Sequence, residues 1–182
     1  MQVAWLAKAI ALPNSILIAE PTKGTFFWKI YMNRPFVIEN ARELKRLTSL
    51  VNRLTDTQLS LPLNEGWTIA VALAHLSFWD QRCLSLIRKW QLSGVSPSPI
   101  DIDVTNECLL PLWQALPPRV AANLAVSSAK DIDCALGDAP SDLIFEIEKL
   151  GERFRLYRSE HRKLHLDEIE EALRRLDSAD PA

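Results

Sequence analysis

Glycine and cysteine are both scarce in this sequence of 182 residues, which contains five glycines and three cysteines. Cys83, Cys108 and Cys134 are odd in number, lie far apart and form no C-x-x-C pair. A disulfide framework needs paired cysteines, so this pattern favours a reducing, cytoplasmic compartment. We expect all three thiols to be buried and to pack as small apolar side chains.

The sequence also lacks a large excess of charge of one sign. Its 21 basic and 23 acidic residues are mixed along the chain and leave a formal net charge of -2. Nucleic-acid binding needs a basic stripe, and the sequence has none. No apolar run approaches the roughly 20 residues that span a bilayer. The sequence therefore predicts neither a nucleic-acid nor a membrane partner. Its length and its hydrophobic content of 48% are those of one well-packed domain.

The amino end differs in character from the rest of the chain. Met1 to Ala19 is mostly apolar and has some features of a signal peptide, but Lys8 interrupts it and no basic cluster precedes the apolar part. Residues 1–31 share none of the helical pattern that follows them. We therefore expect residues 1–31 to be a leader outside the domain or, alternatively, a loosely packed arm. The domain is expected at 32–177, and a disordered tail at 178–182.

Apolar residues recur at spacings of three and four in most segments after residue 32, as on the buried face of an amphipathic helix. No segment there keeps the alternating pattern of a strand. Val95–Pro99 is a turn-rich connection, and residues 61–66 are expected to be a loop. The prediction is an all-α fold, a four-helix bundle with long connections and an extra amino-terminal arm. The expected helices cover about residues 36–55, 68–93, 105–116, 118–136, 141–150 and 152–177.

The chain has only three histidines, and two of them are one helical turn apart near the carboxyl end. His161 and His165 project from a face that is otherwise mostly apolar, while Arg162 and Lys163 are expected on the opposite, solvent side. His75 lies on the inward stripe of the second long helix. An H-x3-H pair and a third imidazole from a facing helix can supply three ligands to one metal ion. The alternative is a set of histidines without a metal, hydrogen-bonded in the core or exposed.

Two stretches resemble the motifs of a known family. Residues 66–80, GWTIAVALAHLSFWD, are similar to the motif of DinB/YfiT-like proteins, in which G-W-T/S is followed by L-x-H-L-x-x-W-D. This superfamily includes the metal-binding amino-terminal domain of mycothiol-dependent maleylpyruvate isomerase. Residues 158–169, RSEHRKLHLDEI, are similar to the family's H-x3-H pair followed by L-x-x-I. The resemblance covers about residues 36–176.

The resemblance implies a four-helix bundle that binds one divalent metal ion, commonly zinc or nickel, through His75, His161 and His165. It also implies a homodimer and chemistry on low-molecular-weight thiols such as mycothiol, bacillithiol or glutathione. Maleylpyruvate isomerases carry a further carboxyl-terminal domain, whereas this sequence ends soon after its last expected helix. That difference argues against this particular activity.

Two further side chains are candidates for the site. Glu168 could orient a ligand histidine, act as a fourth ligand or serve as a base, and pairing with Arg158 or Arg82 is the favoured alternative. Trp79 lies one turn from His75 on the same face, so we expect it beside a substrate.

The expected function is that of an enzyme in which a bound metal holds a low-molecular-weight thiol as its thiolate for transfer to a small electrophilic substrate. One alternative is a hydrolase that uses metal-bound water. Another is a binding or stress-associated scaffold in which the metal is structural or absent. A structural metal would have a closed shell of four ligands, whereas a catalytic metal keeps an open position.

Overall fold

The computed structural model describes residues 34–64, 66–151 and 155–179. Helices make up nearly all the regular structure in these ranges, which confirms the all-α prediction. The expected arm at 1–31 and residues 180–182 of the expected tail lie outside the described residues, and residues 178 and 179 are helical. No described helix has both the length and the apolar character needed to cross a membrane. The elements are α2 (Pro35–Arg53), α3 (Asp56–Leu59), β1 (Pro62–Asn64), β2 (Trp67–Thr68), α4 (Ile69–Ser93), α5 (Ile102–Gln114), α6 (Pro118–Asp138), α7 (Ser141–Lys149) and α8 (Arg158–Ala179).

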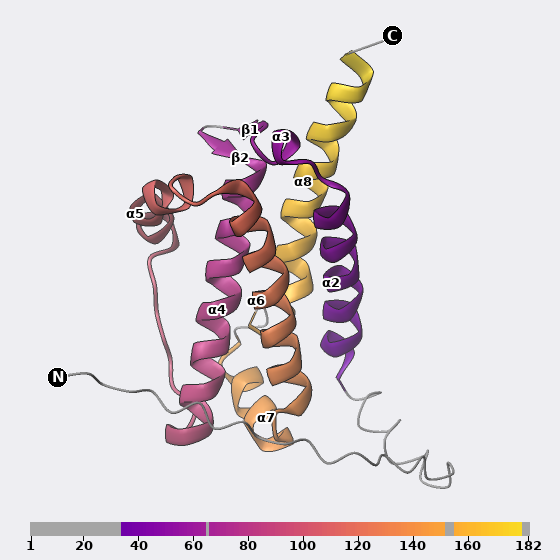
Figure 1. Ribbon diagram of the computed structural model, residues 1–182. Coiled ribbons are helices and arrows are strands. Elements are labelled where there is room, and N and C mark those ends of the chain that lie inside the picture. Colours follow the sequence, from indigo (N-terminus) through magenta and orange to yellow (C-terminus); the bar gives the residue numbers. More distant parts are fainter. Residues whose placement is uncertain (1–33, 65, 152–154, 180–182) are drawn as a thin grey trace, which may run out of the picture.

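Four long helices, α2, α4, α6 and α8, run side by side and form the body of the protein (Figure 1). Helices α4 and α2 each pack on both α6 and α8. The shorter α5 lies beside α4, on the side away from α2, and α7 lies near one end of the body (Figure 1). All four long helices contribute to the apolar core, with Leu50, Leu73, Ala125 and Leu166 as examples.

Helix α4, which carries His75 and Trp79, begins and ends where the sequence predicts. At its start, the hydroxyl oxygen of Thr68 accepts a hydrogen bond from the backbone N–H of Val71 at 3.2 Å. At its end, Gly94 has a φ of 79°, in the left-handed region that glycine adopts without steric cost. Both signals are local, so they are visible in the sequence.

Residues 62–64 of the loop expected at 61–66 form a short strand instead, so that part of the prediction is wrong. Strand β1 pairs with β2, with Pro62 opposite Thr68 and Asn64 opposite Trp67. Strands of two or three residues are too short for an alternating pattern to be recognised. The pairing holds Trp67 directly before α4, where its ring lies 4.9 Å from the ring of His75.

Helix α8 begins at Arg158, later than predicted, because a side chain from another helix holds the preceding turn. The buried Asn40 of α2 donates from Nδ2 to the carbonyl oxygen of Leu156 at 2.8 Å. Its Oδ1 accepts from the backbone N–H of Ser159, also at 2.8 Å. These bonds substitute for helical hydrogen bonds, and local helix propensity cannot reveal a partner so distant in the chain.

The buried face of α8 differs from the predicted one because it contains arginines. Arg162, predicted on the solvent side, is 0% exposed. Its guanidinium donates to Asp80 at 3.1 Å and to Asp133 at 2.8 Å. Leu164 of the same helix is 56% exposed although its side chain is large and apolar. Periodicity assigns charged side chains to solvent, so it misplaces a buried cation that two carboxylates from α4 and α6 satisfy.

The cysteine prediction holds for one residue of three. Cys83 is buried, whereas Cys108 and Cys134 are exposed, and all three are free thiols. Cys108 belongs to α5, whose one fully buried side chain is Trp113, so most of that helix faces solvent.

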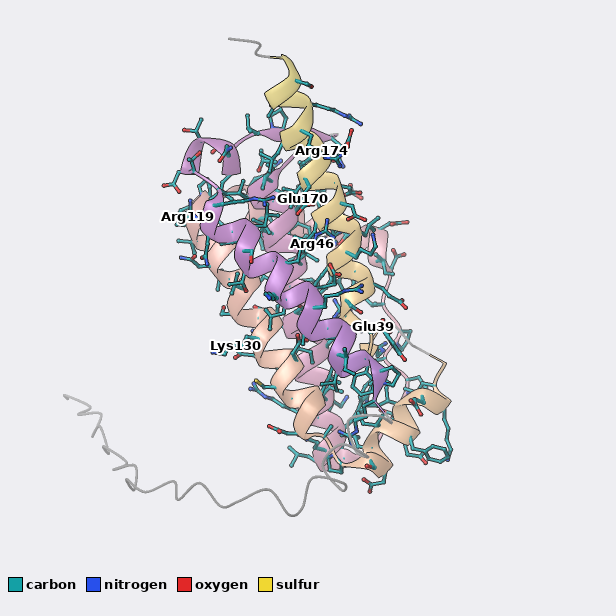
Figure 2. All side chains as sticks on the ribbon, turned by 90° about the vertical axis from the view of Figure 1, so that its right-hand side faces the viewer. Glu39, Arg46, Arg119, Lys130, Glu170 and Arg174 are labelled. Atoms are coloured by element: carbon teal, nitrogen blue, oxygen red, sulfur yellow. The ribbon has the colours of Figure 1, made fainter. Side chains whose placement is uncertain are left out.

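A second group of charged side chains lies where α2 meets α8, and Figure 2 shows Arg46 and Glu170 at this seam. Arg46 is bonded to Asp167 at 2.7 Å and to Glu170 at 2.9 Å, both on α8. It also reaches Glu43 on its own helix at 3.3 Å. Arg46, Asp167 and Glu170 are partly exposed, so water and salt screen their pairs, and each of these pairs contributes about 1 kcal/mol or less. Glu43 is buried, but it is also bonded to Arg42.

Replacing the buried Arg162 with methionine should lower the free energy of unfolding by about 3–5 kcal/mol, because Asp80 and Asp133 lose a buried cation. The matched variant Arg46→Met removes a partly exposed cation that has three acidic partners, and it should cost less, about 1–2 kcal/mol. Urea unfolding followed by far-ultraviolet circular dichroism measures both values. Equal losses in the two variants would contradict the importance of the buried network.

Candidate metal centre

The three histidines of the chain meet in one place, although 86 positions separate His75 from His161. Helix α4 presents His75, and α8 presents His161 and His165. One ring nitrogen from each lies within 4.8 Å of the other two. His75 and His165 are buried, and His161 is partly buried. The predicted triad is therefore assembled, and it could hold a metal ion.

Tryptophan rings surround the histidine cluster. Trp67 lies 4.9 Å from His75 and is nearly parallel to His165, at an interplanar angle of 16°. Trp113 of α5 meets His75 edge-on, with ring centroids 5.2 Å apart. These rings keep water from part of the cluster, which strengthens electrostatic interactions there.

The hydrogen bonds of His161 and His75 fix which nitrogen carries each proton. The Nη2 of Arg158 lies 3.1 Å from His161 Nδ1, and because a guanidinium only donates, that nitrogen accepts. The proton of neutral His161 is then on Nε2, which donates to His75 Nε2 at 3.0 Å. His75 in turn carries its proton on Nδ1, which is buried and has no hydrogen-bond partner among the described residues.

His165 is held in a different way, by a carboxylate. Its Nδ1 donates to Glu168 Oε2 at 2.9 Å, which leaves Nε2 as the acceptor. Glu168 therefore orients a candidate ligand, one of the roles predicted for it. The favoured alternative, a pair with Arg158 or Arg82, is not among the contacts of the described residues. Arg158 pairs with Asp80 at 2.7 Å, and Arg82 donates to a backbone carbonyl.

Burial keeps two of the histidines neutral. It lowers the pKa of His75 to about 3 and that of His161 to about 2, and the positive charge of Arg158 and neighbouring histidines adds to the effect. The nearby side chain of Asn106 slightly opposes this lowering of the His75 pKa. It does not form a hydrogen bond with His75 Nδ1. Metals bind neutral imidazole, so neither ring has to lose a positive charge at neutral pH.

One pair of the three imidazoles has the spacing expected around a tetrahedral metal ion, and nitrogens of all three lie within 4.8 Å of one another. Nitrogens about 2.0–2.1 Å from such an ion are about 3.3 Å apart. The Nε2 atoms of His75 and His161 are separated by 3.0 Å. His165 already has the tautomer that a ligand needs, whereas His161 carries its proton on Nε2. For His161 to bind a cation through Nε2, that proton must leave and Arg158 must cease to donate to Nδ1.

A pocket of about 500 Å³ reaches the histidines and is lined by residues of β2, α4, α5 and α8. Trp79, the tryptophan predicted near a substrate, lines this pocket. Its Nε1 donates to Asn106 Oδ1 of α5 at 3.2 Å, so α4 and α5 are joined at the pocket wall. Trp67, Ile102 and Leu164 also belong to the lining.

Sequence reasoning missed several residues that position the cluster. Asp80 binds Arg158 at 2.7 Å and Arg162 at 3.1 Å, and so ties α4 to the helix of the histidine pair. A signal for Asp80 was available, because a carboxylate on the apolar stripe of a helix needs a partner when it is buried. Asn106 carries no such signal, since its place depends on how α5 packs, whereas Trp67 stands in the stretch 66–80 that resembles the family motif.

Comparison of the chain with protein-family models, with curated proteins and with solved structures found no match. The resemblance to DinB/YfiT-like proteins therefore rests on residues 66–80 and 158–169. These stretches contain the three histidines that the fold brings together.

The protein kept free of metal by a chelator should lose stability as the pH falls from about 6.5 toward 3. Unfolded histidine titrates near pH 6.5. The folded-state pKa values of His75 and His161 are about 3 and about 2. Between these limits the unfolded chain binds protons that the folded chain does not, so unfolding becomes easier as the pH falls. Each ring contributes up to about 1.4 kcal/mol per pH unit.

Urea unfolding at about pH 7 and about pH 5 measures this dependence. The variant His161→Gln should show a shallower dependence, by about one proton, because one of the two rings is gone. Identical dependence in the variant and the natural sequence would show that His161 is not kept neutral by the fold.

Proposed function

We propose that this protein is a DinB/YfiT-like, metal-dependent enzyme that transfers a low-molecular-weight thiol to a small electrophilic substrate. One observation carries the proposal: imidazole nitrogens from two helices lie within 4.8 Å of one another in the lining of a pocket. The resemblance of residues 66–80 and 158–169 to the family's motifs adds support. Zinc or nickel is the cation that the resemblance implies, and imidazole nitrogens suit both.

The chain's own residues would hold the ion and prepare its surroundings. His75, His161 and His165 would bind the cation, whose positive charge favours the thiolate form of a bound thiol. Glu168 keeps the proton of His165 on Nδ1, so that Nε2 stays available. Trp67 shields the cluster from water on the side of the hairpin.

The nucleophilic sulfur would come from outside the protein. No cysteine belongs to the described lining of the pocket. Cys83 is buried, and burial raises the pKa of its thiol, which disfavours the reactive thiolate. These observations support an external small-molecule thiol rather than a cysteine nucleophile.

Two observations favour a catalytic over a structural role for the metal. Three ligand groups converge within the described ranges, whereas structural zinc sites usually have four. The cluster also lines a pocket large enough for a substrate. Hydrolysis with water as the nucleophile would use the same cluster, but Glu168, the candidate base, is already hydrogen-bonded to His165. Thiol transfer is therefore the better-supported reaction.

Protein purified without an affinity tag and loaded with zinc or nickel should retain about one ion per chain after desalting. The variant His161→Ala should lose it, because two ligands hold a cation much less tightly. Glu168→Ala should weaken binding by about 10–100-fold, since His165 loses its orienting partner. Elemental analysis and competition with a chelator measure these effects.

The matched control is Glu171→Ala, which removes another acidic side chain of α8 that is bonded to Arg174 and Arg175 instead of a histidine. It should leave metal binding unchanged. Full retention of the ion by His161→Ala would exclude the histidine cluster as the metal site.

The metal-loaded protein should consume a low-molecular-weight thiol in the presence of an electrophile, and a chelator should abolish the reaction. A panel of glutathione, bacillithiol and mycothiol with several electrophiles, followed by thiol titration, measures the activity. His165→Ala should be inactive, whereas Glu171→Ala should retain full activity. Blank results over the whole panel with metal bound would favour the scaffold function.

A further inference from the structure

Four large apolar side chains line the pocket beside the histidine cluster. The indole rings of Trp67 and Trp79 line it, together with Ile102 of α5 and Leu164 of α8. Ile102 is 53% exposed and Leu164 is 56% exposed, although both are large and apolar. Apolar surface that water wets in the free protein gives favourable free energy when an apolar ligand covers it.

The charged groups of the lining are few and already engaged. Arg158 donates to Asp80 at 2.7 Å and to His161 at 3.1 Å. Glu160 carries the opposite charge, so the charges of these two lining residues balance. A ligand body that carried carboxylates would meet indole and aliphatic surface there, and an unpaired charge on such a surface is costly.

Apart from the three histidines, Asn106 is the neutral polar side chain of the described lining. Its Oδ1 accepts from Trp79 Nε1 at 3.2 Å, which uses the acceptor and holds the amide against α4. The amide then has its Nδ2 donors for a ligand atom that accepts hydrogen bonds. A few fixed polar groups in an otherwise apolar pocket are the usual basis of ligand orientation.

From these observations we propose that the pocket binds a substrate with a neutral, flat, apolar body of one or two rings and a hydrogen-bond acceptor that reaches Asn106. The inference rests on the proposed function, because it names the class of electrophile that the histidine cluster would face. The volume of about 500 Å³ equals that of roughly 15 water molecules, enough for two fused rings with a short substituent. Indole faces favour contact with flat rings.

The test uses the full chain loaded with zinc and two neutral probes of similar size, 2-naphthalenemethanol and glucose. Titration is followed through the indole N–H resonances of the tryptophans by NMR. The naphthyl alcohol should bind with a dissociation constant on the order of 0.1 mM, and glucose should not saturate. Leu164→Glu should weaken binding of the naphthyl alcohol by about tenfold or more, because the substitution places a carboxylate in the apolar wall of the pocket.

The control is Leu92→Glu, which places the same charge at an exposed apolar position outside the described lining of the pocket, 91% exposed near the end of α4. It should leave the affinity unchanged. Equal binding of both probes, or equal effects of the two substitutions, would overturn the inference. Zinc content is measured on the same samples, so a pocket that binds the naphthyl alcohol without retaining zinc would support this ligand class and overturn the proposed metal-dependent function.

Discussion

The buried carboxylate of Asp80 is the group on which the arrangement of the site depends. From α4 it accepts hydrogen bonds from Arg158 at 2.7 Å and Arg162 at 3.1 Å, both on α8. Each arginine has a further partner, His161 for Arg158 and Asp133 of α6 for Arg162. A buried charge without a partner costs several kcal/mol, so α8 cannot slide along α4 without losing these bonds. The contacts that fix the register of the helix therefore also fix its histidines.

The two histidines of α8 have partners of opposite charge. His165 donates to Glu168, the kind of partner that makes an imidazole a better ligand. His161 accepts from Arg158, which keeps its proton on the nitrogen that faces His75. A cation at this cluster competes with the bond between His161 and His75, and it meets the positive charge of a neighbouring guanidinium. Any affinity of the cluster for a cation would therefore depend on Asp80 and Arg158 as well as on the three imidazoles.

Local signals in the sequence were sufficient for most helices and for the histidine pair of α8, whereas the three-ligand set with His75 was implied by the family resemblance. The cap at Thr68 and the spacing of His161 and His165 depend only on neighbouring residues, so both could be predicted. The late start of α8 and the burial of Arg162 could not, because each depends on a partner more than 25 positions away, Asn40 in one case and the carboxylates of other helices in the other. Asn106 reaches the pocket only through the packing of a short, largely exposed helix, which periodicity does not describe.

Very few positions in this structure require one particular residue. His75 and Asp80 on one helix, and Arg158, His161 and His165 on another, must keep their identity and spacing for the site to form. Apart from buried polar residues such as Asn40 and Arg162, most of the core needs only apolar volume, which many combinations of aliphatic residues supply. Related sequences can therefore diverge over most of their length while these five residues and their spacing are retained. A search for H-x4-D followed by R-x2-H-x3-H on two amphipathic segments would find such kin where overall identity has faded.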